Sequence, residues 1–181
     1  MAKIGSDRPT ALVTGANRGL GLETSNQLRS NGFRVILTSR DKKKGITAVQ
    51  GLDPNGGDVL YHQLDITEGA SISALAKDLP SLAPRLDLLV NNAGIGSWGA
   101  DRRASARTIA TNYFGSRDVT DALLPFIPDG GLFRFSIIGD DPAKAFEVLE
   151  RFLPELILAV APAHRLGLLG SKLAAETASV A

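Results

Sequence analysis

The sequence contains no cysteine, and this absence excludes several kinds of chemistry. Without a thiol the chain forms no disulfide, uses no cysteine nucleophile and offers no thiolate to a metal. Histidine is almost as rare, because only His62 and His164 occur and they lie far apart in the sequence. We therefore expect no metal site, and we interpret both histidines as structural or exposed.

Long apolar runs are missing as well. The longest, residues 156–163, is too short to cross a bilayer and contains Pro162. The polar residues 1–10 lack the apolar core of a signal peptide. A formal net charge of +1 over 181 residues gives no general attraction to nucleic acid or acidic membranes. We expect a cytoplasmic protein that binds neither. Two local clusters of basic residues are interpreted as solvated faces: Lys42–Lys44, and Arg102, Arg103 and Arg107.

The sequence does contain a regular alternation of apolar strands and helices through its first three quarters. Thr67 is the expected N-cap of the third helix. Strands are predicted at residues 11–13, 33–38, 58–62, 86–90 and 132–138, and helices at 19–31, 42–52, after Thr67, and 104–124. Nearly continuous apolar strands that alternate with helices are typical of parallel strands covered on both faces. The pattern predicts a doubly wound, Rossmann-type α/β sheet.

The pattern changes after Gly139, because residues 140–181 are predicted to be helical, divided by Pro154 and Pro162. No sixth or seventh strand follows, so we expect a sheet that is shortened at its C-terminal end. With 44% apolar and 22% charged residues, the chain has the composition of an ordinary globular protein. We expect one domain of residues 1–181, with a core of residues 1–139 and a helical segment of residues 140–181.

A glycine-rich loop, TGANRGLG at Thr14–Gly21, lies between the first strand and the first helix. Glycines at this place permit a tight turn and a close approach of the backbone to a pyrophosphate, whose charge is favoured at a helix N-terminus. A purely structural turn is the alternative. The loop residues that we expect to contact a dinucleotide are Gly15, Asn17, Arg18, Gly19, Leu20 and Gly21.

This loop and three further segments, in the same order, resemble the short-chain dehydrogenase/reductase family. The three are Asp-Ile-Thr at residues 65–67, Asn-Asn-Ala-Gly at residues 91–94 and Asn112 in the long helix. The resemblance covers residues 10–139 closely. Within the family, the sequences of these segments are most similar to those of the branch of the carbonyl, menthone and salutaridine reductases.

The resemblance implies roles for these segments. Asp65 and Ile66 would lie at the adenine, and Asn112 would hold a water of the proton relay. Asn91, Ala93 and Gly94 would support the sheet and the cofactor.

The end of the second strand indicates which dinucleotide is bound. An acidic residue there would accept from a ribose 2′-hydroxyl and repel a 2′-phosphate. Here the strand ends in Ser39 and Arg40, and the glycine loop adds Arg18. Two guanidinium groups suit a 2′-phosphate, because arginine offers planar, charge-assisted donors. We predict NADP(H). The alternative is that Asp41 pairs with Arg40.

In the family a tyrosine, a lysine four residues later and a serine cooperate in catalysis. The resemblance assigns Ser136 to the serine that orients the carbonyl oxygen and Lys172 to the lysine that holds the nicotinamide ribose. A plain serine at a strand end is the alternative for Ser136. Leu168 occupies the tyrosine position. Tyr113 is a poor substitute, since it points about 100° away from Asn112 on its helix.

The sequence therefore predicts an NADPH-dependent oxidoreductase that reduces the carbonyl of a small ketone or aldehyde to an alcohol. The alternatives are a non-catalytic NADP(H)-binding module and a subunit that needs a partner chain. They are favoured by Leu168 and by a chain that stops nine residues after Lys172, where we expect the family's last strands and its covering loop to be missing. The oligomeric state and the individual substrate are left open.

Overall fold

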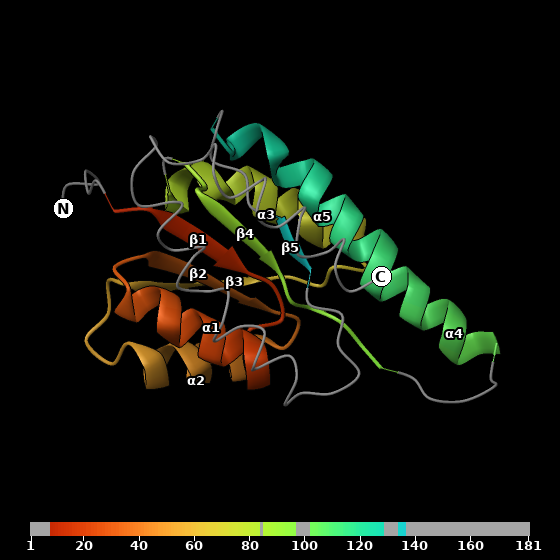
Figure 1. The fold of residues 1–181 in the computed structure, drawn as a ribbon, viewed down its shortest axis with the longest axis horizontal. Coiled ribbons are helices and arrows are strands. Elements are labelled where there is room, and N and C mark those ends of the chain that lie inside the picture. Colours follow the sequence, from red (N-terminus) through yellow and green to blue (C-terminus); the bar gives the residue numbers. More distant parts are fainter. Residues whose placement is uncertain (1–7, 84, 97–101, 129–133, 137–181) are drawn as a thin grey trace, which may run out of the picture.

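Parallel strands hydrogen-bond in the order β3-β2-β1-β4-β5 in a computed structural model of the chain (Figure 1). The structure describes residues 8–83, 85–96, 102–128 and 134–136, and of residues 134–136 it describes the backbone. The strands are β1 (Thr10–Val13), β2 (Arg34–Ser39), β3 (Val59–Gln63), β4 (Leu88–Asn91) and β5 (Arg134–Ser136). The predicted parallel sheet is confirmed.

Helices cover both faces of this sheet (Figure 1). They are α1 (Gly19–Ser30), α2 (Lys42–Leu52), α3 (Gly69–Leu82), α4 (Arg102–Ile109), the π-helix η1 (Ala110–Gly115), α5 (Ser116–Leu123) and the short 3₁₀ helix η2 (Leu124–Phe126). Helices α1 and α2 lie on one face, and α3 and α5 lie on the other. The doubly wound architecture follows from this arrangement.

The apolar strands explain why both faces are covered. Along β2, Val35 and Leu37 pack on the side of α1 and α2, while Ile36 packs on the side of α3 and α5. Each of the three side chains is completely buried. Successive side chains of a strand point to opposite faces, so an uninterrupted apolar run needs a cover on each.

Two local predictions differ from the structure. The residue before α3 is Glu68 and not Thr67, because the Thr67 hydroxyl donates to Asp65 Oδ1 at 2.7 Å instead of capping the helix. The predicted helix 104–124 is helical throughout, but its middle turn is the π-helix η1. The predicted helical segment of residues 140–181 lies outside the described residues.

The strand order places the loops that follow β1 and β4 side by side. The chain runs outward from β1 to β2 and β3, and then returns to the other side of β1 with β4. In open α/β sheets, ligands bind at the carboxyl ends of the strands where the order reverses. Here that position holds Thr14–Gly21 after β1 and residues 91–94 after β4.

Candidate functional site

A pocket of about 860 Å³ lies at the carboxyl ends of the central strands. Its lining comprises Gly15, Asn17, Arg18, Gly19, Leu20, Gly21, Arg40, Leu64, Asp65, Ile66, Thr67, Asn92, Ala93, Gly94, Ile95, Arg107, Ala110 and Thr111. The structure thus brings together all six expected residues of the glycine loop with residues that follow β2, β3 and β4. Ser39, Asn91 and Asn112 are not among the lining residues.

Two glycines of the loop adopt left-handed backbone conformations, with φ of +64° at Gly15 and +58° at Gly19. A Cβ at Gly15 would lie 2.8 Å from Cα of Ala93, so the two loops approach each other closely there. A Cβ at Gly19 would meet no atom within 4 Å. Because Gly19 is the first residue of α1 and lines the pocket, the backbone at this helix N-terminus is open to a ligand.

Thr14 and Asn92 join the loop after β1 to the loop after β4. The Asn92 side chain donates from Nδ2 to the carbonyl oxygens of Thr14 and Gly15, at 2.8 and 3.2 Å. In return, the Thr14 hydroxyl accepts the backbone N–H groups of Asn92 and Ala93. Both side chains belong to the motifs recognised in the sequence, but we assigned neither to the site. Their position within those motifs was the only available indication.

Asn91 lies one residue earlier and has a different surrounding. The residue is 3% exposed, and Nδ2 donates to the hydroxyl of Thr120 on α5 at 3.0 Å. That hydroxyl donates in turn to the Ser116 carbonyl oxygen at 2.7 Å. In the described part of the chain, Asn91 Oδ1 has no partner. Asn91 therefore ties the end of β4 to a helix and does not line the pocket.

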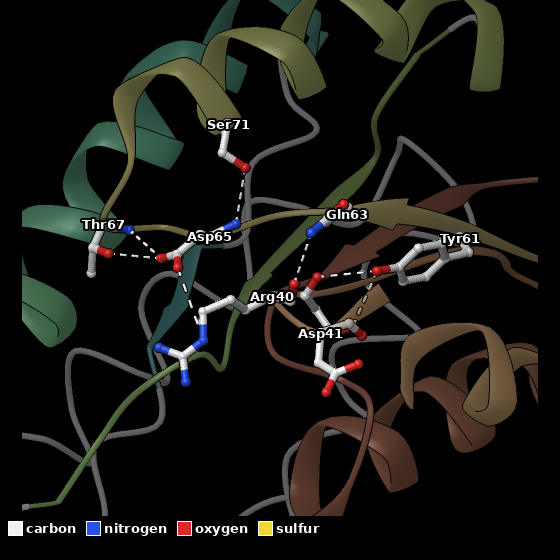
Figure 2. Close-up of polar contacts among 8 residues, drawn as sticks. Arg40, Asp41, Tyr61, Gln63, Asp65, Thr67 and Ser71 are labelled. Carbon is white, nitrogen blue, oxygen red and sulfur yellow. Dashed lines mark hydrogen bonds and ion pairs between the residues drawn. The ribbon is translucent and has the colours of Figure 1, made fainter. Parts of the chain in front are cut away.

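The predicted 2′-phosphate end contains an arginine and a carboxylate (Figure 2). Arg40 is 79% exposed, and its Nε lies 3.9 Å from Oδ2 of Asp65. The other carboxylate oxygen of Asp65 accepts the backbone N–H and the hydroxyl of Thr67, at 3.0 and 2.7 Å. Asp65 is thereby held in place, with Arg40 loosely beside it.

Asp41 does not take the role that the alternative interpretation gave it. Its carboxylate accepts the backbone N–H of Lys44 at 3.0 Å and caps α2, while Oδ2 lies 3.9 Å from Nζ of the same lysine. Arg40 and Asp41 therefore have separate partners, and Figure 2 shows their side chains directed apart.

Ser39 is buried away from the pocket, although we predicted it to bind the cofactor. Its hydroxyl donates to the Asp41 carbonyl oxygen at 2.9 Å and lies 3.4 Å from the Tyr61 hydroxyl. Tyr61 also donates to the Ser39 carbonyl oxygen at 3.2 Å. The side chain of Ser39 thus holds the turn that follows β2.

The side chain of Asn112 also holds the loop after β4, through Ile95. It lies in η1, and its amide exchanges two hydrogen bonds with the backbone of Ile95: Oδ1 accepts the N–H and Nδ2 donates to the carbonyl oxygen, each at 2.9 Å. Single π-turns within α-helices occur often at functional sites. Here the π-turn brings Ala110 and Thr111 to the pocket lining.

The expected catalytic residues are only partly described. The backbone of Ser136 pairs with that of Asn91, which places the end of β5 beside the end of β4. Lys172 and Leu168 lie outside the described residues. Tyr113 is 61% exposed, stacks edge-on with Phe114 and does not line the pocket.

Arg107 was not among the predicted site residues, because we interpreted its basic cluster as a solvated face. The residue is exposed, as expected, but it also lines the pocket. The pocket lining therefore contains three arginines, Arg18, Arg40 and Arg107, and one acidic residue, Asp65. This excess of positive charge favours an anionic ligand.

Two further features of the described residues concern membranes and metals. No helix there is long and apolar enough to cross a membrane. In the same residues, histidine and acidic side chains form no group of three or more that could hold a metal ion.

Comparisons with known proteins identify the family of the chain. The family model described as short chain dehydrogenase matches residues 9–132. Carbonyl reductase [NADPH] 1 of Mus musculus is 44% identical over 139 residues, which are 74% of this chain and 50% of that protein. (+)-Neomenthol dehydrogenase of Arabidopsis thaliana is 37% identical over 143 residues, 65% of this chain and 48% of that protein. The chain spans about half the length of the curated relatives that it matches.

Solved structures give the same result. Salutaridine reductase from Papaver somniferum matches with a TM-score of 0.60 and 35% identity, over 66% of this chain and 53% of that one. A metagenomic short-chain oxidoreductase in complex with NADP matches with a TM-score of 0.59 and 33% identity, over 65% of this chain and 55% of that one.

Proposed function

Because the chain belongs to the short-chain dehydrogenase family, we propose that it is an NADPH-dependent oxidoreductase that reduces the carbonyl of a small ketone or aldehyde to an alcohol. The observation that carries the proposal is the pocket in which the glycine loop, Arg40, Asp65 and the loop after β4 meet. The names of the carbonyl reductase relatives include NADPH, and one solved neighbour is a complex with NADP.

The lining residues fit such a cofactor. The open backbone at Gly19 and the N-terminus of α1 would receive the pyrophosphate. Arg18 and Arg40 would hold the 2′-phosphate, because each is exposed at the pocket and carries a planar set of charged donors. Asp65 and Ile66 would lie at the adenine.

When bound, the cofactor supplies the hydride that adds to the carbonyl carbon. This chain's residues orient the reacting groups. Ser136, at the end of β5, would donate a hydrogen bond to the carbonyl oxygen, and Lys172 would hold the nicotinamide ribose. Asn112 fixes the loop after β4 through Ile95 and would position a water for proton transfer.

A non-catalytic NADP(H)-binding module is the second candidate. It is favoured by Leu168 at the position of the family's tyrosine and by the exposure of Tyr113 outside the pocket. A phenol supplies the proton in the family, and loss of a general acid costs about a hundredfold to ten-thousandfold in rate. In either case we propose that residues 1–181 form one domain. A cytoplasmic location stays a prediction from the sequence.

Binding and turnover distinguish the candidates. NADPH is titrated by its fluorescence against the whole chain, and loss of its absorbance is then followed with a panel of aldehydes and ketones. Binding with substrate-dependent oxidation supports the reductase, and binding without oxidation supports the module. A chain that binds no NADPH contradicts both.

A further inference from the structure

Arg107 belongs to none of the motifs that suggest cofactor binding, yet it lines the same pocket. It lies on α4, whose sequence RRASARTI contains no acidic residue. Within the part of the chain that the structure describes, its guanidinium has no hydrogen bond and no ion pair. An exposed, unpaired cation at the wall of a pocket is available to a ligand.

The continuous helical run of α4 and η1 relates Arg107 to the part of the pocket lining formed by Asp65, Ile66 and Thr67. At the end of η1, Gly115 packs against Ile66, since a Cβ there would lie 2.7 Å from the Ile66 carbonyl oxygen. Thr111 lies four residues before Gly115, and Arg107 four residues before Thr111, so the three follow one side of the run. Arg107 therefore lies about 12 Å along the helix axis from this contact.

Figure 1 shows that α4 extends away from the sheet and beyond the ends of the strands. Arg107 thus lines the pocket from α4, which continues into η1, the π-helix whose Gly115 packs on the segment after β3. The glycine loop, with the expected pyrophosphate position, follows β1. The part of a dinucleotide that lies nearest to the segment after β3 is the adenine, if the proposed function is correct.

We propose that Arg107 is a further cofactor-binding residue whose guanidinium stacks on the adenine ring. A planar guanidinium stacks well on aromatic faces, and arginine is used in this way against unpaired bases. The proposal rests on the proposed function. It separates Arg107 from Arg18 and Arg40, which we assign to the 2′-phosphate.

The test is calorimetric titration of the full chain and its variants with NADPH and NADH. Both dinucleotides carry the same adenine, so Arg107→Ala should weaken both by the same factor, about two- to fivefold for an exposed cation–π contact. Arg107→Tyr should keep the affinity of the unmodified chain, because an aromatic ring stacks on a base without charge. Arg102→Ala, at an exposed position of the same helix outside the lining, is the matched control and should change nothing.

Other results of the titrations would overturn the stacking of Arg107 on adenine or the proposed function. Unchanged affinity in Arg107→Ala overturns the inference. A loss confined to NADPH means a contact with the 2′-phosphate, and a loss that Arg107→Tyr does not restore means a contact through charge alone; either result also overturns it. If the unmodified chain binds neither dinucleotide, the proposed function fails first. Thermal unfolding of each variant without ligand confirms that it is folded.

Discussion

The hydroxyl of Thr14 accepts the backbone N–H of Ala93 at 2.9 Å, across 79 residues of sequence. The same oxygen accepts the N–H of Asn92 at 3.0 Å, and Thr14 is 1% exposed. One buried oxygen therefore connects the glycine loop after β1 to the loop after β4. The two motifs form one pocket because this contact holds them together.

Replacing this hydroxyl tests how much the connection contributes. Thr14→Val leaves the Ala93 N–H without an acceptor and leaves the Asn92 N–H with the Val90 carbonyl oxygen alone, which should cost about 1–3 kcal/mol of the free energy of unfolding. Thr14→Ser keeps the acceptor and is the matched control. Urea denaturation measures the stabilities, and an NADPH titration should show weaker binding only for the valine variant. Equal stability of the two variants would contradict the assigned role.

Gly19→Val should weaken NADPH binding by placing a branched side chain in the open space where the pyrophosphate is expected. The substitution also strains the backbone, because φ is +58° at Gly19. Gly56→Val is the matched control, since Gly56 has φ of +73° and open surroundings but does not line the pocket. Both variants should lose similar stability. Only Gly19→Val should lose cofactor affinity in a fluorescence titration.

The chain should bind NADPH more tightly than NADH, and the double change Arg18→Ala with Arg40→Ala should narrow the difference. A hydrogen bond to a charged group contributes about 1.5–3 kcal/mol. Removal of both arginines should therefore weaken NADPH at least tenfold and NADH little. Lys42→Ala with Lys43→Ala, on exposed positions of α2, removes the same charge outside the pocket. Equal affinities of the unmodified chain for the two cofactors would refute the assignment.

Asp53 should make the free energy of unfolding depend on pH in the acid range. Burial alone raises the pKa of the Asp53 carboxyl. Hydrogen bonds from the backbone N–H groups of Val59 and Asp58, together with the charge of Arg29, lower the pKa by more than burial raises it. The pKa therefore lies below the ordinary 3.8. This stabilisation is complete above pH 3.8 and is lost as the pH falls through the lower pKa of the folded state.

The variant Asp53→Asn isolates that contribution. At neutral pH it should be less stable by about 1–2 kcal/mol, because Oδ2 accepts two N–H groups, at 2.7 and 3.0 Å. The difference should shrink below pH 3.8 as the native carboxylate is protonated. Urea denaturation over a pH series measures it, and a difference that stays constant with pH would show that the charge does not matter.

Leu168→Tyr should introduce or raise reductase activity, because it supplies the proton donor that the family uses. A tyrosine there would lie one helical turn from Lys172, on the same face, if residues 168–172 are helical. Lys172→Ala should mainly weaken cofactor binding in the present chain, and should abolish any activity that the tyrosine brings. NADPH oxidation with a carbonyl panel measures both, and Leu168→Phe controls for size. Activity gained equally with phenylalanine would exclude the proton donor.

Much of the fold could be predicted from residue patterns alone. The predicted helix 42–52 has the same bounds as α2, and the turn after it follows from positive φ angles at Gly56 and Gly57. The prediction at Thr67 was wrong because the Asp65 carboxylate binds its hydroxyl, a competition that spacing does not reveal. The π-turn was missed because apolar spacing does not distinguish one π-turn from the α-helix on either side of it, and Gly115, at its end, packs on Ile66.

The parallel sheet, the glycine loop and the order of the motifs could be predicted from residue patterns, because local spacing and apolar periodicity carry that information. Which side chains reach the pocket depends on the three-dimensional packing of the chain. Ser39 is the last residue of β2 and Arg40 follows it, yet the Ser39 hydroxyl is buried against Tyr61 while the Arg40 guanidinium lies exposed beside Asp65. Arg107 reaches the same pocket from a helix 67 residues beyond Arg40, and such a contact depends on how the helix packs on the sheet.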